Sequence, residues 1–570
     1  MSGLIAEPGA AGEIIFVSPA APRSIRRVPP PSRSKWLVVA LALGVPLAFA
    51  LFTNHAWEDY YITLRSSRNL VAGNGLVFNP GERLHTFTSP LGVLVPALCT
   101  AVTGTDHESA ALWLFRIINV VFLAAAALLV WRRIEALGWT APARLLFFGL
   151  LLADAKLVDF SINGMETALM VYFVLLLWSE LESPAGPKPS RLAAAYGGLM
   201  WTRPDAFILA GLLTVTHFLF RGREARRLPV SWPVLLRGAL IGGLLYAPWF
   251  AWAWWYYGSP VPHTILAKSA ITPPASIPYL LLLPVRELLG RSSLVNLFLP
   301  TYWMFGGWPR LLQYFAQILT VVSLFGWVLP GLAPLARRAS LTLFLGGFYL
   351  CAIIMFPWYV PPWSILAYLT LAQMVDQAGR HAMVAARPLF HTGLRVGCAV
   401  AVLLQAGMLA GTAWQMRNHQ HYVEDQVRHE IGDWLRRHSA PGETVFLEPL
   451  GYIGYFSRMK TYDYPGLSSR EVTAAIKAGN TSYTALIDRL HPDWIVLRPA
   501  ELGRPEFQVN PILERDYQVV KEWNATPQLD AVRVLPGRAW VEFEAHYYLF
   551  KRNSSAGGRI PAPNVRKPAP

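Results

Sequence analysis

Apolar runs separated by short basic turns recur along the first 415 residues of the chain. A helix of about twenty apolar residues crosses the hydrocarbon core of a bilayer, so this pattern predicts about eleven transmembrane helices by the same length criterion. Their approximate ranges are 36–52, 111–131, 145–160, 167–181, two short stretches within 192–220, 234–256, 311–333, 341–357, 363–377 and 394–413. An odd number of spans places the two ends of the chain on opposite sides of the membrane.

Two apolar segments depart from simple straight spans. The sequence Thr202-Arg203-Pro204-Asp205 interrupts the stretch 192–220, and proline removes a backbone donor there, which predicts a broken pair of helices. Residues 89–104 are apolar but contain Pro90 and Pro96. We expect this segment to form a re-entrant or interfacial helix.

The character of the sequence changes at residue 414, where polar residues become frequent. Residues 427–438 have an amphipathic helical pattern, and 444–447 and 494–497 are short apolar runs typical of buried strands. We therefore predict four regions. They are a disordered basic cytoplasmic tail (1–35), a transmembrane domain (36–413) with a first outside loop at 54–110, an outside α/β domain (414–550), and a disordered tail (551–570).

Composition supports a membrane protein and excludes several other classes. Of the 570 residues, 54% are hydrophobic and only 15% are charged, with a formal net charge of +15. Soluble domains carry about 25% charged residues, so a disordered chain, a disulfide-rich secreted domain and an ordinary soluble enzyme are excluded. The three cysteines lie in apolar stretches without metal-ligand spacing.

The distribution of basic residues predicts the orientation and argues against a nucleic-acid partner. Arginine and lysine gather in the short turns between apolar runs, most clearly at Arg221, Arg223, Arg226 and Arg227. Cytoplasmic loops carry such an excess. We therefore expect a multi-pass protein of a bacterial inner membrane, anchored by an uncleaved first span, with a cytoplasmic N-terminus and a periplasmic C-terminal domain.

The most informative polar pattern follows the first span, where Glu58 and Asp59 lie side by side at the membrane surface, after Trp57 and before Arg65 and Arg68. A carboxylate there can act as a general base toward a lipid-phosphate substrate that the arginines hold. The alternatives are that the acids only cap a surface helix and that the arginines only reach lipid headgroups. Trp57 is the better candidate for stacking on a sugar, because the aromatic run 252–257 is typical of an interfacial belt.

Acids inside or at the edge of a membrane are costly and therefore candidates for function. Asp154, Asp159 and Glu166 lie around the second outside turn, with Lys156 as a partner for Asp154. We favour a structural Asp154–Lys156 pair, and helix capping is an alternative role for Glu166.

Five motifs in order carry a resemblance. They are Glu58-Asp59-Tyr60-Tyr61-Ile62 with the turn-rich run 73–83 and Thr88-Ser89-Pro90-Leu91; Asn163-Gly164-Met165-Glu166-Thr167; Thr202-Arg203-Pro204-Asp205; Tyr257-Gly258-Ser259-Pro260 with Lys268; and Asp463-Tyr464-Pro465-Gly466-Leu467. Together they resemble GT-C membrane glycosyltransferases, and within that class the mycobacterial terminal β-(1→2)-arabinofuranosyltransferase family. The sequence departs from the family pattern at Glu58, at Phe87 and at His263, where aspartate, tyrosine and asparagine are usual.

The resemblance implies a GT-C fold and transfer of a sugar, arabinofuranose in this family, from a polyprenyl-phosphate donor to a cell-envelope glycan, glycolipid or protein on the outer face. It carries the catalytic carboxylate to Asp59, beside Glu58. Net retention would require a nucleophile, and the sequence does not separate the roles of the two acids. The candidate donor-binding residues are Arg65, Arg68, Arg203, His263, Lys268, Trp57, His85 and Glu166.

We expect a monomer with no cofactor and no metal, because two adjacent acids on a helix diverge and no further ligand cluster accompanies them. Two other functions stay open. One is a mannosyl- or other hexosyltransferase of the same fold. The other is a flippase or transporter of lipid-linked sugars, which would place charges at the membrane midplane rather than in an outside loop.

Overall fold

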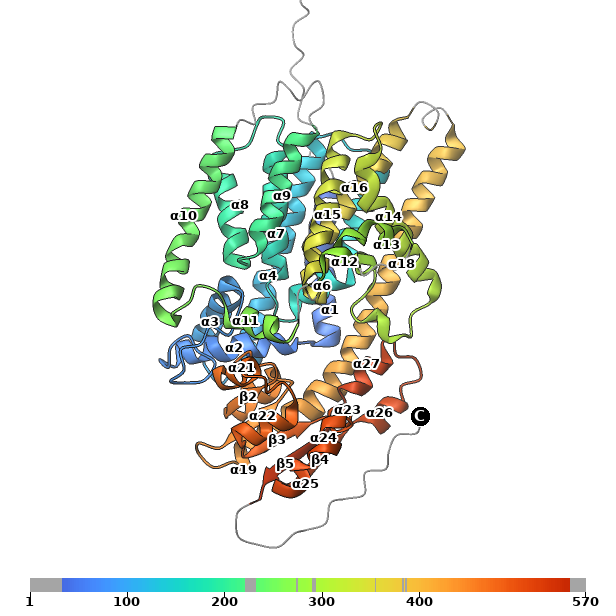
Figure 1. Ribbon diagram of the computed structural model, residues 1–570. Helices are drawn as coiled ribbons and strands as arrows, with labels where there is room; N and C mark the ends of the chain where they lie inside the picture. Colours follow the sequence, from blue (N-terminus) through green and yellow to red (C-terminus); the bar gives the residue numbers. More distant parts are fainter. Residues whose placement is uncertain are drawn as a thin grey trace, which may run out of the picture.

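The computed structural model describes residues 33–220, 232–272, 275–289, 294–353, 355–381, 384 and 387–553. The predicted tails, apart from their innermost residues, and the basic run at 221–227 lie outside these ranges. Helices form an upper bundle, shorter helices lie across its lower end, and a small α/β region sits below them (Figure 1).

Five helices of the described chain are long and apolar enough to cross a membrane. They are α1 (Arg33–Thr53), α4 (Glu108–Ala136), α10 (Trp232–Tyr257), α14 with its 3-10 extension (Arg310–Val328), and α18 (Pro388–Asn418), which continues without a break to His438. The bent pair α6 (Ala155–Ile162) and α7 (Thr167–Leu181) makes a sixth candidate, with 120° between its two parts.

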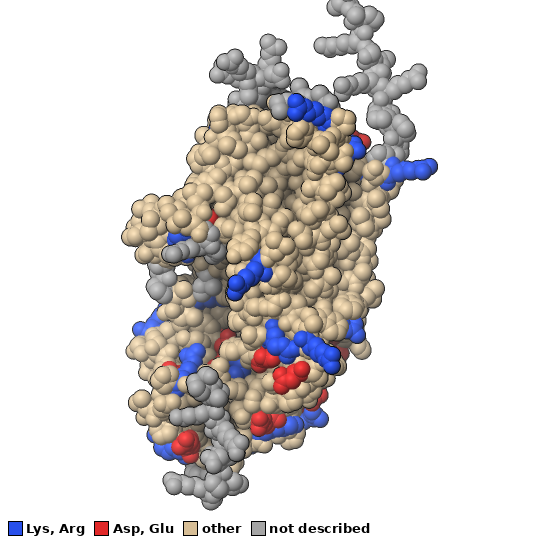
Figure 2. Space-filling model, turned by 90° about the vertical axis from the view of Figure 1, so that its right-hand side faces the viewer, with Lys and Arg blue, Asp and Glu red and all other residues tan. Residues whose placement is uncertain are grey.

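The other predicted spans correspond to helices that are shorter or more polar. These are α5 (Ala141–Ala153), α8 (Pro189–Thr202), α9 (Ala206–Leu219), α15 (Pro334–Ala352) and α16 (Pro361–Arg380). A multi-pass membrane protein is therefore confirmed, whereas the count of about eleven spans stays a prediction. Figure 2 agrees: one face of the bundle is almost free of charge, and acidic and basic residues gather over its lower end.

The predicted break in the stretch 192–220 is confirmed, whereas the re-entrant or interfacial position of 89–104 stays a prediction. The chain breaks between α8 and α9 at Arg203–Asp205, and the apolar segment with two prolines forms the short helix α3 (Pro90–Thr103). Helices α2 (Glu58–Val71), α3 and α11 (His263–Ile271) lie across the lower end of the bundle (Figure 1). The short helices α12 (Ile277–Leu281) and α13 (Leu283–Leu288) follow α11.

The predicted structural pair inside the bundle is also confirmed. Lys156 Nζ lies 3.7 Å from Asp154 Oδ1 and donates to the carbonyl of Leu299 at 2.5 Å, and both side chains are buried. Asp154 accepts hydrogen bonds from the first backbone N–H groups of α6 and from the Tyr368 hydroxyl at 2.6 Å. The charges therefore neutralise each other and cap a helix, as buried charges must.

Below the bundle, five strands form one sheet in the order β2-β1-β3-β5-β4. The strands are β1 (Thr444–Leu447), β2 (Lys460–Asp463), β3 (Trp494–Leu497), β4 (Tyr517–Asn524) and β5 (His546–Arg552). β1 is parallel to β2 and β3, whereas β5 is antiparallel to β3 and β4. The prediction of β1 and β3 is confirmed to the residue, and the other three strands were missed.

A long helical segment joins the bundle to the sheet. α18 continues into a π-helical stretch, η6 (His419–His429), and then α19 (Glu430–His438). The amphipathic pattern at 427–438 predicted only the last part of this segment. The remaining helices of this region are α20 (Gly451–Ser457), α21 (Arg470–Lys477), α22 (Tyr483–Leu490), α23 (Pro499–Leu502), α24 (Pro505–Val509), α25 (Ile512–Asp516), α26 (Thr526–Asp530) and α27 (Arg538–Phe543).

Candidate active site

The paired acids begin helix α2 at the lower end of the bundle. Trp57 is the N-cap residue in extended conformation, and its backbone N–H donates to the carbonyl of Asn163 at 2.8 Å. Glu58 and Asp59 occupy the first turn, where the helix dipole favours negative charge. Consecutive side chains on a helix point about 100° apart, so the two carboxylates face different surroundings.

Glu58 faces the C-terminal region. Its Oε1 accepts the backbone N–H of Gly451 at 3.0 Å, and its Oε2 lies 3.4 Å from Arg428 Nη1. A Cβ on Gly451 would come within 2.1 Å of the Glu58 carbonyl oxygen, so only glycine permits this approach. Burial raises the pKa of Glu58, and the charge of Arg428 opposes that rise. Glu58 therefore joins α2 to α20.

The carboxylate of Asp59 has different surroundings. Its side chain is partly exposed, and its carboxylate makes no hydrogen bond or ion pair within the part of the chain that the structure describes. Burial raises the pKa of Asp59, and the positive charge of Lys268 on α11 acts against it. Asp59 therefore offers unoccupied carboxylate oxygens near a cation.

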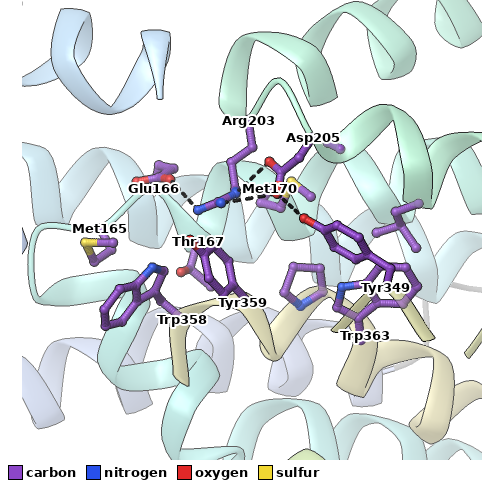
Figure 3. Close-up of a pocket in the computed structure, with 13 residues that line it drawn as sticks. Met165, Glu166, Thr167, Met170, Arg203, Asp205, Tyr349, Trp358, Tyr359 and Trp363 are labelled. Carbon is purple, nitrogen blue, oxygen red and sulfur yellow. Dashed lines mark hydrogen bonds and ion pairs between the residues drawn. The ribbon is translucent and has the colours of Figure 1, made fainter. Parts of the chain in front are cut away.

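A second charged group lies where the two broken helix pairs meet. Arg203, in the break between α8 and α9, lies 3.9 Å from Glu166, in the break between α6 and α7. Its Nε and Nη2 also bond Asp205 at 3.1 and 3.3 Å, and the Tyr349 hydroxyl donates to Asp205 at 2.5 Å. Figure 3 shows Arg203 directed between these two acids. Glu166 is the N-cap residue of α7 and makes no side-chain capping hydrogen bond.

A small cavity of about 30 Å³ adjoins this group. The 3-10 turn η5 (Pro357–Tyr359) forms one wall. Arg203 lies over the ring of Tyr359, 4.3 Å from its centroid, and Lys268 Nζ lies 4.6 Å from the centroid of Phe356. These two rings are only 6.1 Å apart. Residues 356–359 therefore contact both cations, of which Arg203 lines the pocket and Lys268 does not.

Two of the sequence-predicted residues, Glu166 and Arg203, line the pocket together. Asp59 is not among the lining residues, but the charge of Lys268 acts on it. The charges of Asp59 and Glu166 are near enough to influence each other. A free carboxylate and two cations in the same region suit a substrate that carries phosphate and a hydroxyl group to be deprotonated. Sequence analysis missed Tyr349, Tyr359 and Phe356, since aromatic residues near a membrane boundary carry no distinguishing signal.

The structure does not bring the arginines of α2 into this group. Arg65 is buried, and its guanidinium donates to the carbonyls of Gly454 at 2.5 Å and Met459 at 2.8 Å and to Asn79 at 3.2 Å. Burial lowers its pKa to about 9, and neighbouring Arg68 adds to that effect. Arg68 pairs with Asp106 at 3.3 Å. Arg65 therefore binds protein carbonyls, contrary to both the phosphate and the headgroup interpretations.

Trp57 and the two histidines also have protein partners. Trp57 is buried and stacks near Tyr302 and Trp540, with ring centroids 6.0 and 6.3 Å away, so its faces are occupied and the sugar-stacking expectation does not fit. His85 is buried and lies parallel to a tyrosine ring, 4.6 Å away, and burial lowers its pKa to about 3. His263 Nε2 lies 3.0 Å from Thr473 Oγ1, and its backbone N–H donates to the carbonyl of His85. The histidines therefore position α11.

Within the described residues, no group of three or more His, Cys, Asp or Glu side chains has the geometry to hold a metal ion.

Comparison with solved structures identifies the fold. The chain superposes on the crystal structure of ArnT from Cupriavidus metallidurans bound to undecaprenyl phosphate with a TM-score of 0.53, at 14% identity, over 93% of this chain and 100% of that one. The expected GT-C fold, with an added C-terminal α/β region, is therefore confirmed.

Relatives found by sequence have names that state an activity, but they match a smaller part of this chain. Two curated proteins named terminal beta-(1->2)-arabinofuranosyltransferase match 41% of this chain: one from Corynebacterium glutamicum is 32% identical over 263 residues, and one from Mycobacterium tuberculosis is 31% identical over 250 residues. The matches span only 36% and 39% of those relatives. Residues 414–544 match a family described as a domain of unknown function, DUF8728.

Proposed function

We propose that this protein is a membrane glycosyltransferase that moves a sugar from a polyprenyl phosphate to an acceptor hydroxyl. Support comes from three sources: the fold shared with a protein solved with undecaprenyl phosphate, relatives named arabinofuranosyltransferases, and the charged pocket at the lower end of the bundle. The proposed sugar is arabinofuranose, as in the name of those relatives. The proposed acceptor is a glycan, glycolipid or protein of the cell envelope.

The observation that carries the proposal is the Asp59 carboxylate at the start of α2, which makes no hydrogen bond or ion pair within the described residues and on which the charge of Lys268 acts. In the proposed step, Asp59 takes the proton of the acceptor hydroxyl as its oxygen forms a bond to the anomeric carbon. The bond from that carbon to the phosphate oxygen breaks, and the polyprenyl phosphate leaves with the electron pair. Lys268 and Arg203 hold the phosphate and its developing charge.

The two acids thus have separate proposed roles. Glu58 is fixed by Gly451 and Arg428, so it is a positioning residue for the start of α2. Glu166 and Asp205 orient the Arg203 guanidinium from opposite sides. We propose the site on the periplasmic face of a bacterial inner membrane, with the N-terminus in the cytoplasm, and a functional monomer. We keep the division at residues 413 and 414 between the membrane and periplasmic domains.

The experiment is transfer by purified protein in detergent, with polyprenyl-phosphoryl arabinofuranose and a short glycan acceptor. Asp59→Asn is expected to lower kcat by about 10²–10⁴-fold, the usual loss for a missing general base. Its melting temperature is expected to stay near that of the wild type, because no hydrogen bond is lost. Asp488→Asn, an exposed acid of the C-terminal region, is the matched control.

Two results would contradict parts of this proposal. Full activity in Asp59→Asn would remove the carboxylate from the reaction. A sugar covalently attached to Asp59, detected by mass spectrometry in a stalled reaction, would make the residue a nucleophile rather than a base. If the wild type transfers mannose and not arabinofuranose, the proposed sugar is wrong, whereas the proposed fold and the role of Asp59 are unaffected. Transport of the donor without transfer would favour the flippase.

A further inference from the structure

An apolar groove lies between helices of the bundle, away from the candidate active site. It has a volume of about 540 Å³, and most of its wall comes from α1, α5 and α18. Its lining includes Ser34, near the start of α1. Asp59 follows the other end of α1 at Thr53, which is about 28 Å from Ser34 along the helix at 1.5 Å per residue. The groove therefore begins at the end of the bundle opposite the C-terminal region.

The groove is nearly as deep as one leaflet of a bilayer. Its lining extends along α5 from Ala141 to Ala153, or about 18 Å, and one half of a hydrocarbon core measures about 15 Å. A Cβ on Gly149 would come within 2.3 Å of the Val402 side chain, so α5 and α18 touch and form one continuous wall. Apart from Ser34 and one arginine, the lining is apolar. The shape suits a single hydrocarbon chain.

The charged residue of this lining is Arg144, on the first turn of α5. Its guanidinium lies 5.7 Å from the centroid of the Trp131 ring, and its enclosed Nε has no hydrogen-bond partner. Within the described ranges, the side chain makes no hydrogen bond or ion pair. A guanidinium has five N–H donors, and donors without acceptors are costly in an apolar setting. An anionic group from outside the chain would satisfy them.

A second arginine without an ion pair lies at the same end of the groove. Arg395 precedes Val402 by seven residues on α18, so the two lie on nearly the same face of the helix, although Arg395 is not itself a lining residue. A Cβ on Gly379 would lie 3.6 Å from the side chains of both Leu394 and Thr140, which places this part of α18 beside the start of α5. Arg395 is exposed, and the described part of the chain supplies no partner for it. Two guanidiniums are thus available where the groove begins.

The charges distinguish between kinds of lipid. No acid is among the described residues that line the groove. Asp376 accepts the backbone N–H of Thr140 but is already paired with Arg380 at 2.9 Å. The amine of a zwitterionic headgroup would therefore find no partner here, whereas a phosphate can bond to an unpaired guanidinium. A groove one leaflet deep also suits an acyl chain better than a much longer polyprenyl chain.

We propose that this groove binds an anionic phospholipid of the leaflet opposite the C-terminal region. One acyl chain lies between α1 and the wall formed by α5 and α18, and the headgroup phosphate lies at Arg144 with Arg395 beside it. The site is independent of the proposed transfer reaction, because it begins at the other end of the bundle (Figure 1). The bound lipid fills the groove and gives the unpaired arginines their acceptor.

The experiment counts bound lipids on the purified full-length protein by native mass spectrometry. Phosphatidylglycerol and phosphatidylcholine with the same acyl chains are titrated separately. We expect phosphatidylglycerol to bind with a Kd about tenfold lower, the usual effect of a charge-assisted hydrogen bond. Arg144→Gln/Arg395→Gln is expected to abolish this preference. Lys188→Gln/Arg237→Gln, which removes two exposed cations at the starts of α8 and α10, is the matched control and is expected to keep it.

A second pair of variants tests the groove rather than the charge. Ala406 lines the groove, so Ala406→Phe fills it without removing an arginine and is expected to weaken phosphatidylglycerol binding by about tenfold or more. Ala410→Phe, at an exposed position of α18 that does not line the groove, is its control.

Four results would overturn the proposal. They are equal binding of the two lipids, the same loss of preference in both double variants, unchanged binding in Ala406→Phe, and displacement of phosphatidylglycerol by an equal or lower concentration of undecaprenyl phosphate. The last result would make the groove a site for a polyprenyl lipid.

Discussion

At the scale of single residues, two neighbouring acids are separated by the geometry of one helix turn. Glu58 points to α20 and is held by a backbone N–H and an arginine, whereas Asp59 faces the cation of α11. The pKa of both acids is raised, so the difference between them is access. The oxygens of Glu58 are occupied by protein donors, whereas those of Asp59, unpaired within the described residues, are free to accept a proton from a substrate.

The influence of Lys268 on Asp59 predicts a shift in pH dependence. Burial raises the pKa of Asp59 and Lys268 lowers it. Removing the charge in Lys268→Gln therefore raises that pKa further, and the base form is lost at a higher pH. We expect the acid limb of the kcat/KM profile to move to higher pH.

Lys268→Arg is the control for this prediction, because it keeps the charge and is expected to keep the acid limb where it is in the wild type. A profile of Lys268→Gln with an unchanged acid limb and a uniformly lower kcat/KM would contradict the coupling. In that case Lys268 would bind the phosphate without acting on Asp59.

Only part of the site can be predicted from the sequence, and the reason lies in what each residue contacts. Four residues lie near a helix break or a membrane boundary, where an ionisable side chain is costly and is therefore a candidate for function. They are Asp59, Glu166, Arg203 and Lys268. Arg65 has the same sequence context, but its partners are carbonyls of Gly454 and Met459, nearly 400 residues later. Nothing local to α2 indicates such partners.

At the scale of elements, α2 is the part that joins the bundle to the C-terminal region. On one side, a Cβ on Gly164 would come within 2.3 Å of the Tyr60 ring, and Gly164 has a φ of +101° that favours glycine. On the other side, Gly451 meets Glu58 equally closely. A helix enclosed on both sides places Asp59 accurately, as catalysis requires.

Substitution of Arg65 measures how much the contact between α2 and the C-terminal region contributes to the free energy of unfolding. Arg65→Met leaves the carbonyls of Gly454 and Met459 and the Asn79 amide without their donor. Buried polar groups without partners cost about 1–3 kcal/mol each, so we expect a loss of about 3 kcal/mol or more in the free energy of unfolding. Thermal unfolding in detergent measures it.

Arg68→Met is the matched control on the same helix. Its partner Asp106 is 70% exposed, and exposed ion pairs contribute at most about 1 kcal/mol. Equal destabilisation by the two substitutions would contradict the assignment of Arg65 to the junction.

The strands of the sheet show when a hydrophobic pattern is sufficient to predict a strand from the sequence. β1 and β3 lie in the middle of the sheet, and β3 is buried along its whole length, so each appears as a continuous apolar run. β4 is an edge strand with mostly exposed residues, and β5 alternates between buried and partly exposed positions. Their polar residues make them resemble loops, which is why they were missed.

At the scale of the whole molecule, a buried ionic network extends from α2 into the sheet region. Five glutamates share two arginines: Arg428 contacts Glu58, Glu424 and Glu544, and Arg498 contacts Glu448, Glu501 and Glu544. Acids outnumber guanidiniums, so ionising all of them is costly. Glu544, between both arginines, has a lowered pKa, whereas burial raises the pKa of Glu58 and Glu424.

The titration of Glu448 allows the contribution of this network to stability to be tested by varying the pH. Burial raises its pKa from 4.5 to about 7, with added repulsion from Glu544, Glu58 and Glu501, and Arg498 opposes the rise. An acid with a raised pKa binds more protons in the folded state than in the unfolded state, so its contribution to stability falls as pH rises from about 4.5 to about 7.

Glu448→Gln removes that titrating carboxyl group. We therefore expect the difference in melting temperature, variant minus wild type, to become more positive as pH rises through this window and to level off above it. Comparing differences cancels the opposite effect of buried His419, whose lowered pKa favours the folded state at higher pH. Glu514→Gln, at an exposed position, is expected to show no such trend. A difference that falls with pH would mean that the ion pair with Arg498 outweighs burial, and that the network stabilises the junction most when fully ionised.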